Sequence, residues 1–175
     1  MHRVSDGLFS LSIYEVFDDV NRRIRTEVEA IPCDKIAEPG LAEKLAKRYA
    51  IAVPEFDETP SGARLDDKGE FATYRHKIKN SESFRVQPTN SPIIGRHYDV
   101  ALTQTELALK FRANPQQGAN KQMHKQIADT IAGNVRNLAT EIPPRNKALQ
   151  RFAEQVISER ARFCNNLERQ RADLL

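Results

Sequence analysis

The stretch TELALKFRA, residues 105–113, decides the fold class of this sequence. Its apolar residues Leu107, Leu109 and Phe111 alternate with other residues, a pattern typical of a β-strand with one buried and one solvated face. The stretch HYDVALT, residues 97–103, precedes it closely enough to pair with it as a hairpin. Because turn-forming residues also precede FATYRHKIK (71–79) and SFRVQ (83–87), these are two further strand candidates. We therefore expect a small antiparallel sheet of about three to five strands.

Amphipathic helices are predicted before and after this sheet. Apolar residues recur every three or four positions over residues 13–31 and again over residues 41–49. The same spacing returns after residue 119, where Pro143 and Pro144 interrupt it. We expect these prolines to separate two long helices that pack against each other as an antiparallel hairpin.

These elements predict an α+β fold in which the N-terminal helix and the C-terminal antiparallel pair of long helices pack on the small sheet. A length of 175 residues fits one domain. Within this single domain, residues 1–175, we place N-terminal helices in 1–50, the antiparallel sheet in 51–113 and the helical hairpin in 119–173.

The composition excludes several classes of protein. Lys and Arg number 27 against 24 Asp and Glu, and a net charge of only +3 does not indicate a protein that wraps a polyanion. No stretch reaches the ~20 apolar residues that a membrane-spanning helix needs. Ser10, Ser12 and Glu15 interrupt the apolar patch near the N-terminus, so we expect no signal peptide. Together these features predict a cytoplasmic protein.

Residues that bind metals or form disulfides are sparse. Cys33 and Cys164 lie far apart and lack a Cys-x-x-Cys spacing, so we expect neither a disulfide framework nor a cysteine zinc site. The four histidines fall in four separate segments, and no two of them have the spacing of metal ligands on one helix. Glycine-rich phosphate loops are absent from the sequence as well. We predict no cofactor and no metal.

Two short motifs contain residue types that catalytic sites use. His97 and Asp99 would share one face of a strand, where the carboxylate could orient the imidazole as a base. Asp66-Asp67-Lys68, with Asp57 upstream, resembles the acid and lysine set of metal-dependent nucleases. The surrounding stretch is also typical of a turn before a strand, and no nucleophile accompanies His97. We favour the structural interpretation of both and predict no catalytic residue.

Nucleic-acid binding is the alternative that the basic residues support. The last 60 residues hold 10 basic and 6 acidic side chains, whereas residues 1–60 hold 8 and 12. A second possible surface is the sheet, where basic and aromatic residues are mixed: Tyr74, Arg75, His76, Lys77, Lys79, Phe84 and Arg85. The candidate contacts in the C-terminal helices are Arg136, Arg145, Lys147, Arg151, Arg160, Arg162, Arg169 and Arg171.

The order of the elements resembles a known type of module. A first helix in LSIYEVFDDVNRRIRTEVEAIP, the stretch RYAIAVPEFDE before the sheet, and a last helix with RNKALQRFAEQVISERARF are similar to an N-terminal module of bacterial anti-phage defence proteins. Such proteins often continue into a TIR or restriction-endonuclease-like effector domain. The resemblance covers nearly the whole chain, which stops at Leu175, so we expect a standalone version, a subunit or a fragment. It carries over no catalytic residue and implies an accessory, sensing or assembly role.

From these observations we expect a non-catalytic interaction module of an antiviral defence system. It would bind a protein partner, either an effector subunit or a second copy of itself, through its long helices. The alternative is a nucleic-acid-binding module that uses the basic C-terminal helices, and a hydrolase that uses His97 and Asp99 is a third hypothesis. No membrane partner is expected.

Overall fold

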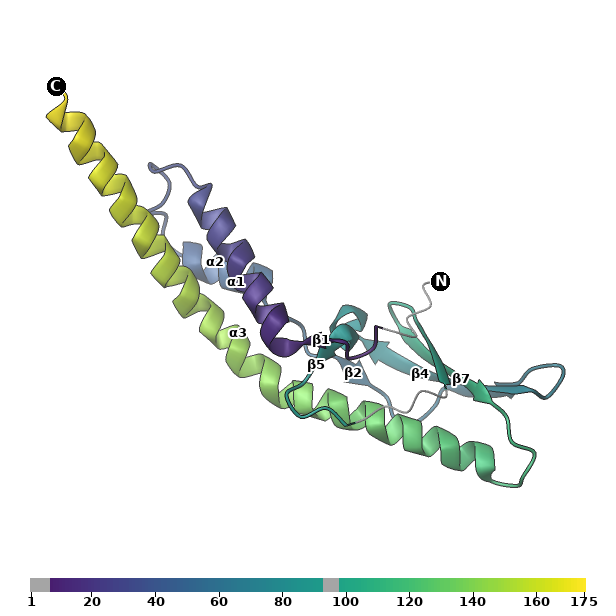
Figure 1. The fold of residues 1–175 in the computed structure, drawn as a ribbon. Helices are drawn as coiled ribbons and strands as arrows, with labels where there is room; N and C mark the ends of the chain where they lie inside the picture. The colour runs from purple at the N-terminus through teal and green to yellow at the C-terminus, as the bar shows by residue number, and fades with distance from the viewer. Residues whose placement is uncertain (1–6, 93–97) are drawn as a thin grey trace. The chain divides into compact units, whose positions relative to one another are not determined.

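The computed structural model describes residues 7–92 and 98–175. The chain is α+β, as expected, and falls into two compact units (Figure 1). The sheet unit comprises the residues up to Ile13 together with Ala52–Ile142, and the helical unit comprises Tyr14–Ile51 and Pro143–Leu175. The single domain expected from the sequence stays a prediction, because two compact units of one chain can still fold together.

The sheet unit is built on five antiparallel strands. They are β2 (Glu55–Phe56), β3 (Gly62–Leu65), β4 (Phe71–Lys79), β6 (Tyr98–Leu102) and β7 (Glu106–Arg112). The order across the sheet is β2-β4-β7-β6, and β3 also pairs with β4. The predicted strands over 71–79 and 105–113 and the predicted hairpin are confirmed.

Side chains of β4 alternate strictly between the two faces of the sheet. Ala72, His76 and Ile78 are buried on the inner face, while Arg75 and Lys77 between them are exposed on the outer face. The register carries this alternation to β7, since Ala72 pairs with the buried Phe111 and Arg75 with Ala108. One face of the sheet is therefore apolar, and the other faces solvent.

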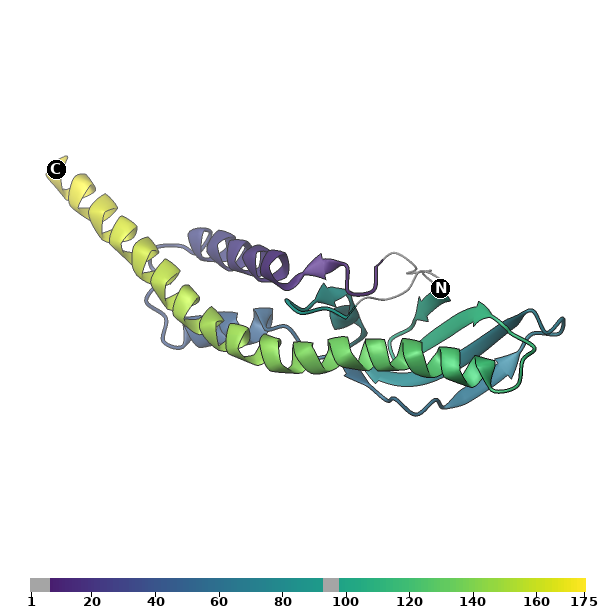
Figure 2. The ribbon, with the colours of Figure 1, turned by 60° about the horizontal axis from the view of Figure 1, so that its bottom comes forward.

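Helix α3 (Ala119–Asp173) begins in the sheet unit, where its first half covers the inner face (Figure 2). Its apolar residues Ile127, Ile131, Leu138 and Ile142 recur at intervals of four or seven residues and are all buried. In the same unit, Phe84 lies in a 3-10 helix (Ser81–Arg85) and is fully buried.

The strand expected at residues 83–87 is mostly wrong. Only β5 (Val86–Gln87) is extended, and it pairs in parallel with β1 (Leu11–Ser12). Asn80, which adopts a left-handed conformation at φ 57°, starts the 3-10 turn that replaces the rest of the expected strand. Alternating side chains alone do not distinguish such a tight turn from a short strand.

The helical unit contains α1 (Ile13–Glu29), α2 (Leu41–Tyr49) and the second half of α3. Helix α1 buries Phe17, Val20, Ile24 and Val28, the stripe that its sequence spacing predicts, and α2 buries Leu45. Polar contacts also join these helices. The Glu27 carboxylate of α1 binds Arg48 and accepts a hydrogen bond of 2.7 Å from the Tyr49 hydroxyl.

The C-terminal hairpin predicted from Pro143 and Pro144 is wrong, because α3 is one helix of 55 residues that contains both prolines. A proline deprives the carbonyl four residues earlier of its helical partner. The residues concerned, Ala139 and Thr140, are exposed, so water can bond their carbonyls. The helix therefore tolerates both prolines without a break.

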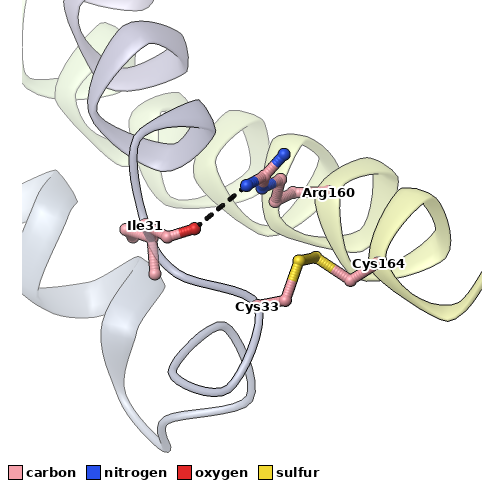
Figure 3. The surroundings of a disulfide bond; sticks show 4 residues. All are labelled: Ile31, Cys33, Arg160 and Cys164. Carbon is pink, nitrogen blue, oxygen red and sulfur yellow. Dashed lines mark hydrogen bonds between the residues drawn. A yellow bond between two sulfur atoms is a disulfide. The ribbon is translucent and has the colours of Figure 1, made fainter. Parts of the chain in front are cut away.

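The prediction that the two cysteines stay unpaired is also wrong. Cys33, in the segment between α1 and α2, forms a disulfide with Cys164 of α3 (Figure 3). Their Cα atoms are 5.6 Å apart although 131 positions separate them in the sequence. Distance along the chain is no guide to distance in space, because a disulfide requires only that the two Cα atoms come close in the folded chain.

Candidate interaction surfaces

The second half of α3 carries one apolar stripe that changes from buried to exposed. Leu149 and Val156 are 2% exposed, but Phe163, which follows at the same interval of seven residues, is 54% exposed. A seven-residue interval keeps side chains on nearly the same side of a helix. From Asn165 to Leu175 no residue is buried. The stripe thus continues beyond the part of α3 that packs within its own unit.

Arg160 lies on the same side of α3, one turn before Cys164. Its guanidinium donates a hydrogen bond of 3.2 Å to the carbonyl of Ile31, so it anchors the end of α1 to α3 beside the disulfide (Figure 3). Its Nε is buried without a hydrogen-bond partner, and its charged end lies 5.1 Å from the centre of the Phe163 ring. Arg160 is therefore part of the packing of the helical unit rather than a free cation.

A shallow groove of about 340 Å³ runs along these residues within the helical unit. An ion pair between Arg25 and Glu159, 3.1 Å long, crosses it, and the Arg25 guanidinium also stacks over Phe152. The hydrogen bond from Arg25 lowers the pKa of the Glu159 carboxyl. The groove is lined by Arg25, Glu29, Val156, Glu159, Arg160 and Phe163.

The basic residues predicted to bind nucleic acid do not form one surface. Arg136 belongs to the sheet unit and pairs with Glu58 at 3.4 Å. Arg145 stacks over the Tyr14 ring, and Arg160 is engaged as described. Each residue of an α-helix is rotated by about 100° about the helix axis from the one before it. By this measure four of the remaining predicted contacts lie within about 60° of each other on the exposed side of α3, and Arg171 lies on another side. These four are Lys147, Arg151, Arg162 and Arg169.

The mixed basic and aromatic set of the sheet is divided between its faces. Tyr74 and His76 point to the inner face, where the Tyr74 ring stacks on His124 with a centroid separation of 3.9 Å. Phe84 is buried in the 3-10 helix, and Arg85 beside it is exposed. Only Arg75, Lys77 and Lys79 remain on the outer face.

A buried pair of histidines links the sheet to α3. The Nε2 atoms of His76 and His124 are 2.7 Å apart, and Nδ1 of His76 is 2.7 Å from the carbonyl oxygen of Asp57. Burial lowers the pKa of both imidazoles, and that of His124 falls to about 4. The neighbouring His76 lowers the pKa of His124 further, because two charged rings would repel each other. Both rings are therefore neutral at pH 7. No sequence spacing connects residues 76 and 124, so this pair was not predicted.

One of the two motifs considered as catalytic sites takes a structural role. Asp66 closes the turn between β3 and β4, because its carboxylate accepts hydrogen bonds from the N–H groups of Glu70 and Phe71. Gly69, at φ 68°, completes this turn, as the turn interpretation predicted. Asp99 is exposed on β6, whereas His97 lies outside the described residues.

Over residues 7–92 and 98–175, no three His, Cys, Asp or Glu side chains come together in a way that could hold a metal ion. Among the described helices, none is both long and apolar enough to cross a membrane. No protein family, curated protein or solved structure matches this chain.

Proposed function

We propose that this chain is a non-catalytic interaction module of a bacterial antiviral defence system, and that it acts through protein–protein contacts of α3. The observation that carries the proposal is the exposure of Phe163 on the stripe that buries Leu149 and Val156. A phenylalanine gains about 2 kcal/mol when it moves from water into a packed site, so an exposed one on a helix stripe favours a partner.

The end of α3 supports the same proposal. Leu167 follows Phe163 at an interval of four residues and is half-buried, while all other residues from 165 to 175 are exposed. A short helical segment without tertiary contacts is marginal in water, so a partner helix on this stripe would stabilise it. In such helix-in-groove contacts the anchoring side chains are spaced by three, four and seven residues, so that they lie on one face of the helix.

The place in a defence system is proposed from the resemblance of the element order. An accessory or sensing subunit of this type would work in the cytoplasm beside its effector. Disulfides are rare in the cytoplasm, because thiols there are kept reduced. In that compartment the Cys33–Cys164 disulfide would be exposed to reduction.

The proposal is tested by placing a photocrosslinking phenylalanine analogue at position 163 in the native host. We expect one protein adduct, which mass spectrometry would identify as a partner or as a second copy. The matched control carries the analogue at Ser158, an exposed position on the other side of α3. An identical adduct from both positions, or none from position 163, would contradict the proposal. So would a nuclease or NAD-cleaving activity of the purified chain that one substitution abolishes.

A second candidate function is nucleic-acid binding by α3. It is favoured by the alignment of Lys147, Arg151, Arg162 and Arg169 on one exposed side of the helix. Exposed acidic residues, Glu154 and Asp173, lie near this row and weaken its field. Changing Arg151, Arg162 and Arg169 to Glu should abolish salt-sensitive binding if this row is the contact. Arg160 is left unchanged because it holds Ile31.

A further inference from the structure

The outer face of the sheet unit is an exposed and predominantly basic surface. The register places residues of β3, β4 and β7 side by side on this face, because Arg64 pairs with Thr73 and Thr73 with Lys110. Only three acidic residues of the described strands share the face: Glu55, Asp99 and Glu106. Six basic side chains are exposed on it: Arg64, Arg75, Lys77, Lys79, Lys110 and Arg112.

Internal ion pairs neutralise only part of this charge. Glu106 pairs with Arg75 at 3.3 Å, and Glu55 pairs with Lys79 at 3.7 Å. Lys110 lies over the ring of Phe71, 4.8 Å from its centre. The remaining basic side chains are exposed and form no ion pair with a described residue: Arg64, Lys77 and Arg112.

The chemistry of the face selects among ligands. Its residues are charged or small apart from Phe71, which is half-buried under Lys110, so the face lacks the apolar centre typical of protein interfaces. It also lacks the exposed aromatic rings on which single-stranded bases stack. What it offers is a grid of cations, about 6.8 Å apart along a strand and about 4.8 Å between strands. Such a grid fits a row of phosphates.

We propose that the outer face of β3, β4 and β7 binds the phosphate backbone of double-stranded nucleic acid without regard to sequence. Arg64, Lys77 and Arg112 are the principal contacts, because they form no ion pair with a described residue, and Glu106, which lies opposite Lys77 in the register, is already paired with Arg75. Phosphate contacts of this kind position a protein on a duplex and carry no sequence information. This inference does not rest on the protein-binding role proposed for α3, and it uses different residues from the basic row of that helix.

The experiment measures fluorescence anisotropy of a labelled DNA duplex titrated with the full chain at several salt concentrations. Three to four neutralised phosphates predict a slope of about −3 for the logarithm of affinity against the logarithm of salt concentration. Changing Arg64, Lys77 and Arg112 to Glu should weaken binding at least about tenfold and flatten that slope. The triple change to Gln should act in the same direction, which separates charge loss from repulsion.

The matched control is the Arg22→Glu, Lys35→Glu, Lys121→Glu variant, which alters the net charge by the same amount at exposed positions outside the sheet and outside the basic row of α3. Its affinity should stay within about twofold of the unaltered chain. Circular dichroism must show that each variant is folded. Unaltered binding by the sheet variant, loss of binding by the control alone, or no binding at about 50 mM salt would each overturn the proposal. Binding to anionic vesicles but not to the duplex would overturn it as well.

Discussion

His76 and His124 share one hydrogen bond, and their neighbours fix which ring donates it. The Asp57 carbonyl can only accept, so Nδ1 of His76 carries the proton that faces it at 2.7 Å. Nε2 of His76 is then the acceptor, and Nε2 of His124 donates across 2.7 Å. A further proton on Nε2 of His76 would remove that acceptor, so the pair is built for two neutral rings.

The stability of the sheet unit should therefore depend on pH. The pKa of His124 is lowered from 6.5 to about 4, so the unfolded chain binds more protons than the folded chain between these values. The contribution of His124 to the free energy of unfolding is fully present above pH 6.5. It is lost as the pH falls towards 4, and the loss is at most ~3 kcal/mol. Urea unfolding at a series of pH values measures the change.

Carboxylates also titrate in this range, so a variant must isolate the histidine. His124→Gln retains an N–H donor for His76 and does not titrate, and its unfolding free energy should vary less between pH 6.5 and 4. An identical pH profile for the two proteins would show that His124 does not contribute.

Reduction of the disulfide should destabilise the helical unit. The bond closes a loop of 131 residues, and the chain-entropy model assigns up to about 5 kcal/mol to such a closure. We expect a reducing agent to lower the melting temperature, followed by circular dichroism. The Cys33→Ser, Cys164→Ser variant should melt at the lower temperature and not respond to the reducing agent. Two thiols that alkylate readily in the unreduced, folded protein would contradict the bond.

Asn146→Ala should destabilise the helical unit by about 1–3 kcal/mol. The Asn146 amide accepts a 2.9 Å hydrogen bond from the N–H of Ile51 and donates one of 2.8 Å to its carbonyl. Removing it leaves both backbone groups of Ile51 without that partner. Asn165→Ala, at an exposed position of the same helix, is the control and should change stability by less than about 0.5 kcal/mol. Chemical denaturation compares the two.

Hydrogen exchange can decide whether α3 is continuous across Pro143 and Pro144. In one helix the amides of Lys147 and Ala148 bond to carbonyls four residues earlier and should exchange slowly. If a second helix began near residue 147, these amides would lie in its first turn and exchange quickly. Fast exchange at Lys147 and Ala148, together with slow exchange at Leu138, would favour two separate helices, as in the predicted hairpin.

Sequence patterns located the elements whose signal is local. Alternation over 71–79 and the spacing over 41–49 matched β4 and α2 because each pattern reports one buried face. The proline pair misled the prediction, since exposure of the helix at that point leaves its freed carbonyls to water.

The features that the sequence did not predict depend on tertiary contacts. Cys33 with Cys164, and His76 with His124, are brought together by packing and have no signature in spacing. Among the predicted nucleic-acid contacts, Arg160 makes a tertiary contact that the sequence does not show either, because the carbonyl that accepts its hydrogen bond belongs to Ile31. The protein-binding and defence roles stay predictions.

The two faces of β4 have a consequence for how this protein can change in evolution. The strand holds His76 on the packed side and Lys77 on the solvent side, in consecutive positions. An insertion or deletion of one residue within 71–79 would exchange these sides for every position beyond it, burying lysines and exposing the histidine. Related proteins should therefore differ along β4 by substitutions rather than by insertions or deletions. Differences in length should be confined to the turns that flank the strand.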